Sequence, residues 1–158
     1  MEKKYKLTEE TINVNGKTLH RIEALKDFGD VKKGDKGGYI EKEENLSHYD
    51  NCWVYENAIV CGNAKVYGNV KIYDKAVVCD NARIHDNAKV CGNAQVYDYA
   101  EVCGNAVVYD NAKIFGDAIV FGNAKVYGNA KVYDEADVYG EADVCGNAEV
   151  CGDMEVYY

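Results

Sequence analysis

Histidines and cysteines are the residues of this chain best suited to metal or redox chemistry. The chain has three His (His20, His48, His85) and seven Cys, but no CxxC pair and no Cys/His cluster with the short spacing of zinc sites. Six Cys fall in one slot of a six-residue repeat, alternating with Tyr and Phe: Cys61, Cys79, Cys91, Cys103, Cys145 and Cys151. This placement is typical of small apolar residues and of free thiols in a reducing compartment. The sequence therefore predicts no metal site, no cofactor and a cytoplasmic protein.

Carboxylates form the second group with chemical potential. The net charge is −9, and residues 133–158 hold eight acidic residues and no Lys or Arg. We call these residues, with three Tyr among them, the acidic collar: Tyr133, Asp134, Glu135, Asp137, Tyr139, Glu141, Asp143, Glu149, Asp153, Glu155 and Tyr157. Such a surface repels nucleic acid and anionic membranes. It predicts docking on a basic, partly apolar protein surface, although charged residues also protect an open sheet edge from pairing.

A six-residue repeat in the sequence determines where these side chains lie in the fold. From Val54 to Val156 every position divisible by six is Val or Ile, and two residues before each, from Ala58 to Ala148, stands Ala, with Val70 as the exception. A period of six fits neither an α-helix nor a meander of hairpins. It is typical of a β-solenoid, in which each short strand turns two side chains inward before a corner. Three strands close a triangular coil, so the 18 hexads predict about six coils, each rising about 4.8 Å.

Residues 1–39 lack the repeat and are expected to cap the first coil. Thr11–Val14 and Lys17–Ile22 flank Asn15-Gly16. This pair suits the type I′ turn of a β-hairpin, because both turn positions need a positive φ.

The solenoid is assigned to residues 40–158. Its start is irregular, since Ile40, Leu46 and Cys52 fall in the slot that later holds Ala. Gly, Asn and Asp stand at the corners, where they tolerate the left-handed conformation of a sharp turn.

The hexad Val-Tyr-Gly-Asn-Ala-Lys resembles the hexapeptide repeat, aliphatic-x-x-x-small-x, of left-handed parallel β-helix proteins. The resemblance covers residues 40–158 and implies an all-β, left-handed triangular prism that forms trimers. One departure is the position after the aliphatic residue, usually small in this family, which here is Tyr nine times, Cys six times, Phe twice and His once. The segment from Gly34 to Ile40 also resembles uncharacterised proteins of phages and mobile elements.

Many members of the family are acyltransferases, and others resemble γ-class carbonic anhydrases. The first class needs a general-base His near a loop that leaves the prism, but nothing interrupts the repeat between Val54 and Val156. The second class gathers three His at a subunit boundary, but only His85 lies in the repeat. His85 shares its row with Tyr67, Cys103 and Phe121, so we expect it to belong to an aromatic ladder. The sequence thus predicts that the chain is not an enzyme.

Residues 18 apart stack on one another, and the positions after the aliphatic residues form three corner rows of Tyr, Cys and Phe. Stacked rings and thiols stabilise the coil. One row lies beside outward apolar residues, and together they form the apolar strip: Ile59, Cys61, Val77, Cys79, Tyr97 and Phe115. Contiguous apolar surface of this kind is typical of interfaces. We predict that the apolar strip is the contact of a homotrimer.

These features favour a non-catalytic binding or inhibitor module, phage-encoded on the second resemblance. Its acidic collar would compete for the Lys and Arg of a host defence component that normally hold phosphates. One alternative is an oligomeric sponge that holds a nucleotide-like molecule between prisms, near Lys65, Arg83 and Lys89. A second alternative is a structural or scaffold protein, and an acyltransferase is the least favoured class. The sequence predicts no membrane span, and no secretory leader at Met1–Lys6.

Overall fold

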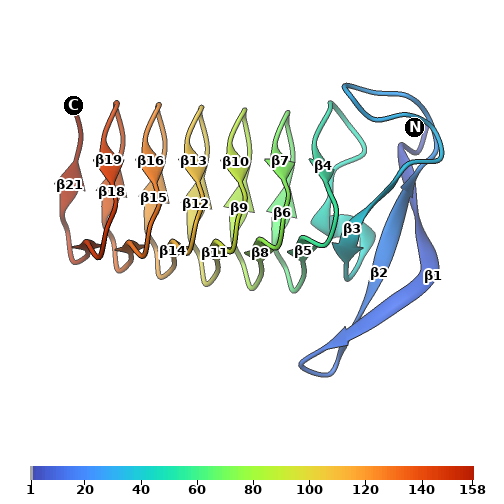
Figure 1. Cartoon of the computed structure of the whole chain (residues 1–158), viewed down its shortest axis with the longest axis horizontal. Coiled ribbons are helices and arrows are strands. Elements are labelled where there is room, and N and C mark those ends of the chain that lie inside the picture. The colour runs from blue at the N-terminus through green and yellow to red at the C-terminus, as the bar shows by residue number, and fades with distance from the viewer. Residues whose placement is uncertain (1) are drawn as a thin grey trace.

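The computed structural model describes residues 2–158, so Met1, the first residue of the expected capping segment, lies outside it. This part of the chain is all-β, with 21 strands and one short 3₁₀ helix, η1 (Glu43–Asn45). Figure 1 shows stacked coils that run from a hairpin at one end to the C-terminus at the other. Within residues 2–158, η1 is far too short to span a lipid bilayer, and no other helix occurs. The expected β-solenoid with an N-terminal hairpin is confirmed.

The coils build three sheets, and each regular coil gives one two-residue strand to each sheet. The first sheet contains β1 (Tyr5–Val14), β2 (Lys17–Ala24), β3 (Lys36–Ile40), β5 (Ile59–Val60), β8 (Val77–Val78), β11 (Gln95–Val96), β14 (Lys113–Ile114), β17 (Lys131–Val132) and β20 (Glu149–Val150). The second sheet contains β4 (Trp53–Val54), β7 (Lys71–Ile72), β10 (Lys89–Val90), β13 (Val107–Val108), β16 (Lys125–Val126) and β19 (Asp143–Val144). The third sheet contains β6 (Lys65–Val66), β9 (Arg83–Ile84), β12 (Glu101–Val102), β15 (Ile119–Val120), β18 (Asp137–Val138) and β21 (Glu155–Val156).

Neighbouring coils pair in parallel at a spacing of 18 residues, as Val90 pairs with Val108. The backbone N–H of Cys91 donates to the carbonyl of Val108 at 2.9 Å, and the same contact recurs along all three sheets. The aliphatic residues of the repeat and the Ala residues up to Ala142 point inward and form one continuous buried core, whereas in the last coil Ala148 is exposed and Val156 is half-buried. Each coil is therefore held by its two neighbours. The left hand of the coil stays a prediction from the family resemblance.

The first coil departs from the expected register. Ile40 pairs with Val60, and Leu46 forms a bridge with Val66, so both partners lie 20 residues away instead of 18. Ile40 and Leu46 thus occupy the aliphatic slot, and their predicted place in the Ala slot is wrong. The physical reason is a wider corner after Leu46, which contains two extra residues. Cys52 is buried in the Ala slot, as expected.

The corners hold residues in the left-handed conformation. Gly92 has φ +63°, and a Cβ at this position would lie 2.8 Å from the backbone nitrogen of Asp110 in the next coil. Where Asp replaces Gly, its carboxylate accepts a hydrogen bond from the backbone N–H found 18 residues later. The Asp residues with this contact are Asp74, Asp80, Asp86, Asp98, Asp110 and Asp134. The corner residues therefore tie one coil to the next.

The hairpin forms around Asn15 (φ 51°) and Gly16 (φ 82°), so the predicted pair of positive φ angles is confirmed. Its strands, β1 and β2, are longer than the sequence indicated. β2 pairs antiparallel with β3, and β3 pairs parallel with β5, so the hairpin extends the first sheet of the solenoid. The predicted capping segment and the solenoid thus share one sheet.

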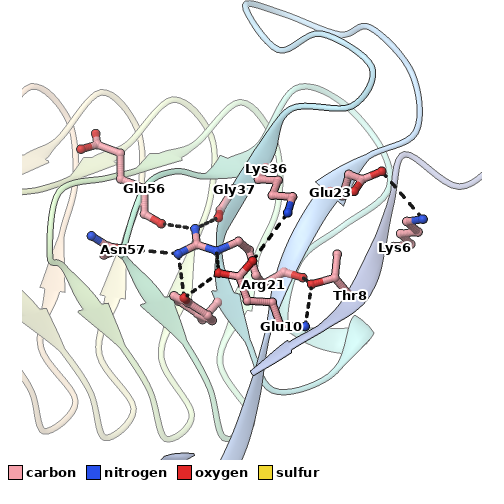
Figure 2. A network of polar contacts seen from close by, with 10 residues as sticks. Lys6, Thr8, Glu10, Arg21, Glu23, Lys36, Gly37, Glu56 and Asn57 are labelled. Atoms are coloured by element: carbon pink, nitrogen blue, oxygen red, sulfur yellow. Dashed lines mark hydrogen bonds and ion pairs between the residues drawn. The ribbon is translucent and has the colours of Figure 1, made fainter. Parts of the chain in front are cut away.

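Arg21 fastens the hairpin to the first coil (Figure 2). Its guanidinium donates to the carbonyl oxygens of Gly37 at 2.6 Å and Glu56 at 3.0 Å. It also donates to the carboxylate of Glu10 at 2.8 Å and to the hydroxyl of Tyr39 at 2.6 Å. The Tyr39 ring lies 4.3 Å from the guanidinium carbon. A planar guanidinium can serve these partners together, whereas an ammonium group cannot.

Candidate functional site

The acidic collar lies on the coils farthest from the hairpin (Figure 1). Its carboxylates project from all three sheets, since Asp143 is on β19, Glu149 on β20, and Asp137 and Glu155 on β18 and β21. Its other four carboxylates stand in exposed corner positions: Asp134, Glu135, Glu141 and Asp153. The structure therefore brings the predicted collar residues together on consecutive coils.

Two tyrosines of the acidic collar are bound to its own carboxylates. The Tyr133 hydroxyl donates to Glu149 at 2.8 Å, and the Tyr139 hydroxyl donates to Glu155 at 3.3 Å. The third tyrosine, Tyr157, stacks on Tyr139 with ring centroids 5.0 Å apart and keeps 58% of its surface exposed. The tyrosines thus fix the direction of two carboxylates, and Tyr157 leaves an apolar ring beside them.

The carboxylates of the acidic collar form no ion pairs within the described chain, although Lys125 lies opposite Asp143 and Lys131 lies opposite Glu149 in the sheets. No ion pair formed within residues 2–158 involves a collar residue. Asp137 and Glu155 lie directly opposite each other in the third sheet. Partial burial, together with the charge of Glu155, raises the pKa of Asp137. A cation brought by another molecule would relieve this repulsion.

The apolar strip is only partly open. The hairpin residues Ile12, Val14 and Leu19 join a cluster that contains three members of the strip, Ile59, Cys61 and Cys79. The repeat could not predict this contact, because the hairpin residues lie outside it. The other three members, Val77, Tyr97 and Phe115, are half-buried, and the rings of Tyr97 and Phe115 stack at 5.0 Å. The part of the apolar strip that lies outside this cluster begins at Val77.

The three histidines lie in different parts of the fold. His20 is on β2, and its Nδ1 lies 3.0 Å from the carbonyl oxygen of Thr8. His48 lies in the first coil, where its ring stacks on Tyr5 at a centroid distance of 4.1 Å. Burial lowers the pKa of His48. His20 and His48 therefore make contacts that hold the fold together.

His85 follows β9 in the corner row, and its ring stacks on Tyr67 at 4.8 Å, as an aromatic ladder requires. Its two ring nitrogens also face carboxylates. Nε2 lies 2.5 Å from Oε2 of Glu101, and Nδ1 lies 3.3 Å from Oδ1 of Asp86. Cys103, one coil later, brings its thiol to the same corner. His85 thus belongs to a polar cluster as well as to a ladder.

The spacing of 18 residues already places His85 and Cys103 in one row, but this row was interpreted as an aromatic ladder and Asp86 was not assigned to it. His85 and Cys103 are 18 residues apart, which is one coil. The signal that finds them is the coil length itself, applied to chemically active residues.

Comparison with known proteins gives one short similarity. No family model matches the chain. A stretch of 37 residues, 23% of this chain, is 46% identical to the uncharacterized acetyltransferase YdcK of Escherichia coli strain K12. The stretch spans only 11% of the length of that protein. The chain fits the hexapeptide-repeat β-helix superfamily. Its regular 18-residue coils carry the repeat from Val54 to Val156, and the short similarity to an acetyltransferase agrees with this fit.

Proposed function

We propose that this hexapeptide-repeat protein is a non-catalytic binding module whose acidic collar docks on a basic protein surface. The observation that carries the proposal is the group of eight carboxylates on consecutive coils without a cation among them. Complementary charge favours encounter with a Lys- and Arg-rich surface and fixes its orientation. The exposed ring of Tyr157 offers apolar contact beside the charges.

The resemblance of residues 34–40 to proteins of phages and mobile elements supports a partner in host defence. A defence protein that holds nucleic acid in a basic channel has the required chemistry. Carboxylates would occupy the Lys and Arg side chains that otherwise bind phosphates. In this proposal the chain acts as an inhibitor by occupying that channel.

The test is binding of a fluorescent Lys- and Arg-rich peptide that also contains aromatic residues. One triple variant reverses charge in the collar, Asp137→Lys, Asp143→Lys and Glu149→Lys. The matched control makes the same change in net charge near the hairpin, with Glu9→Lys, Glu44→Lys and Glu56→Lys, all exposed residues. We expect the collar variant to bind at least about 10-fold more weakly, since each exposed pair contributes up to about 1 kcal/mol.

Fluorescence anisotropy at several salt concentrations measures both affinities. Equal losses in the two triple variants would show attraction by net charge alone and would overturn the proposal. Circular dichroism of both variants checks that the solenoid stays folded.

The short similarity to an acetyltransferase supports a second candidate function, acyl transfer from a thioester. His85 with its Glu101 contact would be the base for this reaction. However, its second nitrogen, Nδ1, faces the carboxylate of Asp86 instead of an open substrate position. Acetyl transfer from a thioester by the wild-type chain, lost in His85→Phe, would replace the binding proposal with this function.

A further inference from the structure

Three chemically different metal ligands meet at one corner of the solenoid. His85 and Asp86 follow β9, and Cys103 follows β12 in the next coil. One ligand atom from each of the three residues lies within 4.8 Å of the other two. Imidazole nitrogen, carboxylate oxygen and thiolate sulfur are the three ligand types that zinc accepts in proteins. The coil spacing, and not a short motif, makes this arrangement.

The surroundings orient the His85 ring for such a role. The 2.5 Å contact between Nε2 and Glu101 holds the ring so that Nδ1 faces the cluster. A histidine that binds a metal usually donates its other N–H to a carboxylate in this way. Arg83 pairs with the same carboxylate at 3.3 Å, and Tyr67 stacks on the ring with an angle of 2° between the planes. The ring is therefore held by Tyr67 on one face and by Glu101 at its edge before any ion binds.

The Asp86 carboxylate is held as well. Its Oδ2 accepts a hydrogen bond from the backbone N–H of Gly104 at 3.0 Å. The other oxygen, Oδ1, lies 3.3 Å from Nδ1 of His85. An ion bound to both atoms would take the place of the hydrogen bond between them.

Cys103 supplies the third ligand atom from the neighbouring coil. The thiol would bind a metal ion as the thiolate, with release of its proton to solvent, as cysteine ligands do. The mixed ligand set favours ions of intermediate softness over Mg²⁺ or Ca²⁺.

The cluster borders a groove with a volume of about 690 Å³, lined by Tyr67, Asn69, Asp86 and Gly104 among others. Of the three ligands, Asp86 lines this groove. Three protein ligands leave the fourth position of a tetrahedral ion for water or another ligand. We propose that His85, Asp86 and Cys103 bind a divalent transition-metal ion of the zinc type, with Glu101 as the positioning residue.

The test is titration of the full chain with Co²⁺, which reports thiolate ligation by a charge-transfer absorption band, followed by displacement with Zn²⁺. We expect one equivalent of ion to give the band. We expect His85→Phe and Cys103→Ser to lose it. Glu101→Gln should weaken binding by about 10-fold or more, the usual effect of removing a contact to a ligand histidine. Phe121 occupies the same row as His85, so the Phe variant is compatible with the fold.

Cys91→Ser is the matched control, because Cys91 occupies the corresponding slot next to Tyr73 and has no His neighbour. It should keep both the band and the affinity. Thermal unfolding with and without Zn²⁺ gives a second readout, since an ion that bridges two coils raises Tm. Absence of a band in the wild type would overturn the proposal. So would a band of unchanged strength in His85→Phe and Cys103→Ser, which would place the ion at other thiols such as Cys61 and Cys79.

Discussion

Asp110 and Gly128, one coil apart, are joined by a hydrogen bond from the backbone N–H of Gly128 to Oδ2 of Asp110 at 3.1 Å. Asp110 holds φ 55°, a conformation that is unfavourable for most L-residues. The same side chain therefore tolerates the corner and bonds the next coil. Five further Asp residues make this contact, so it is a recurring device of the solenoid.

Asp110→Ala should lower the free energy of unfolding by about 2 kcal/mol, because it loses the hydrogen bond and keeps a left-handed backbone without a suitable side chain. Asp110→Gly should cost about 1 kcal/mol, since Gly accepts this conformation. Urea unfolding measures both values. The exposed neighbour Asn111, changed to Ala, should have little effect. Equal costs for the Ala and Gly variants would contradict the role of the backbone conformation.

Arg21→Lys should lower the free energy of unfolding by about 1.5 kcal/mol and speed amide exchange in β1 and β2. An ammonium group cannot replace the guanidinium contacts to Gly37, Glu56 and Tyr39. Lys6→Met is the control, because Lys6 forms only an exposed pair with Glu23 at 3.7 Å. Exchange in the hairpin that is the same in both variants would speak against Arg21 as its fastening point.

Asp137→Asn should raise the free energy of unfolding by about 0.5 kcal/mol at neutral pH, because like charges directly opposite in a sheet repel. The folded state raises the pKa of Asp137, first by burial and then by the charge of Glu155. The contribution of the Asp137 carboxyl to stability is therefore present at low pH and is lost as the pH rises through the raised pKa. The increase in the free energy of unfolding that Asp137→Asn gives at neutral pH should therefore disappear in acid. Asp143→Asn, which removes a carboxylate opposite Lys125, should instead be neutral or destabilising.

Stability should fall in alkali, between about pH 9 and pH 12. Burial raises the pKa of Cys103 from 9.0 to about 11, and a hydrogen bond with Cys91 raises that of Tyr73 from 10.0 to about 12. A group whose pKa is raised on folding stabilises the protein fully below its unfolded pKa and loses this effect as the pH approaches the folded pKa. Urea unfolding across this range measures how steeply the free energy of unfolding falls with pH. Cys103→Ser should make this fall less steep between about pH 9 and pH 11. A flat profile for the wild type would contradict the shifts.

Val77→Glu should convert a trimer to a folded monomer, because Val77 lies where the apolar strip leaves the cover of the hairpin. Light scattering measures the mass of both proteins. Val107→Glu, at the equivalent outward position of the second sheet, should leave the trimer intact. A wild-type monomer would remove the trimer prediction and make the strip a surface for another partner.

The period of six was sufficient to predict the three sheets, the buried residues and the corners, because each slot of the hexad has one environment. The first coil could not be predicted, since its wider corner breaks the count on which the prediction depends. Asn45 shows what the repeat does not encode. It is buried, accepts hydrogen bonds from the N–H groups of Glu41 and Lys42, and donates to the carbonyls of Gly62 and Ala64.

The candidate sites were predictable to different degrees. The acidic collar follows from composition and from the repeat, so its residues were found together. The coil length places His85 and Cys103 in one row, but a slot assignment does not give the direction in which Asp86 and the other two side chains point at the corner. The hairpin cover on Ile59 and Cys61 depends on how an irregular segment folds back, and no periodicity describes that.

Because each coil is bonded only to its neighbours, the number of coils sets the distance between the hairpin and the acidic collar. Adding or deleting one unit of 18 residues would move the acidic collar by about 4.8 Å relative to the hairpin, with no change in either end. The distance between the two ends can thus be changed in steps of one coil, by changing the number of 18-residue units in the sequence.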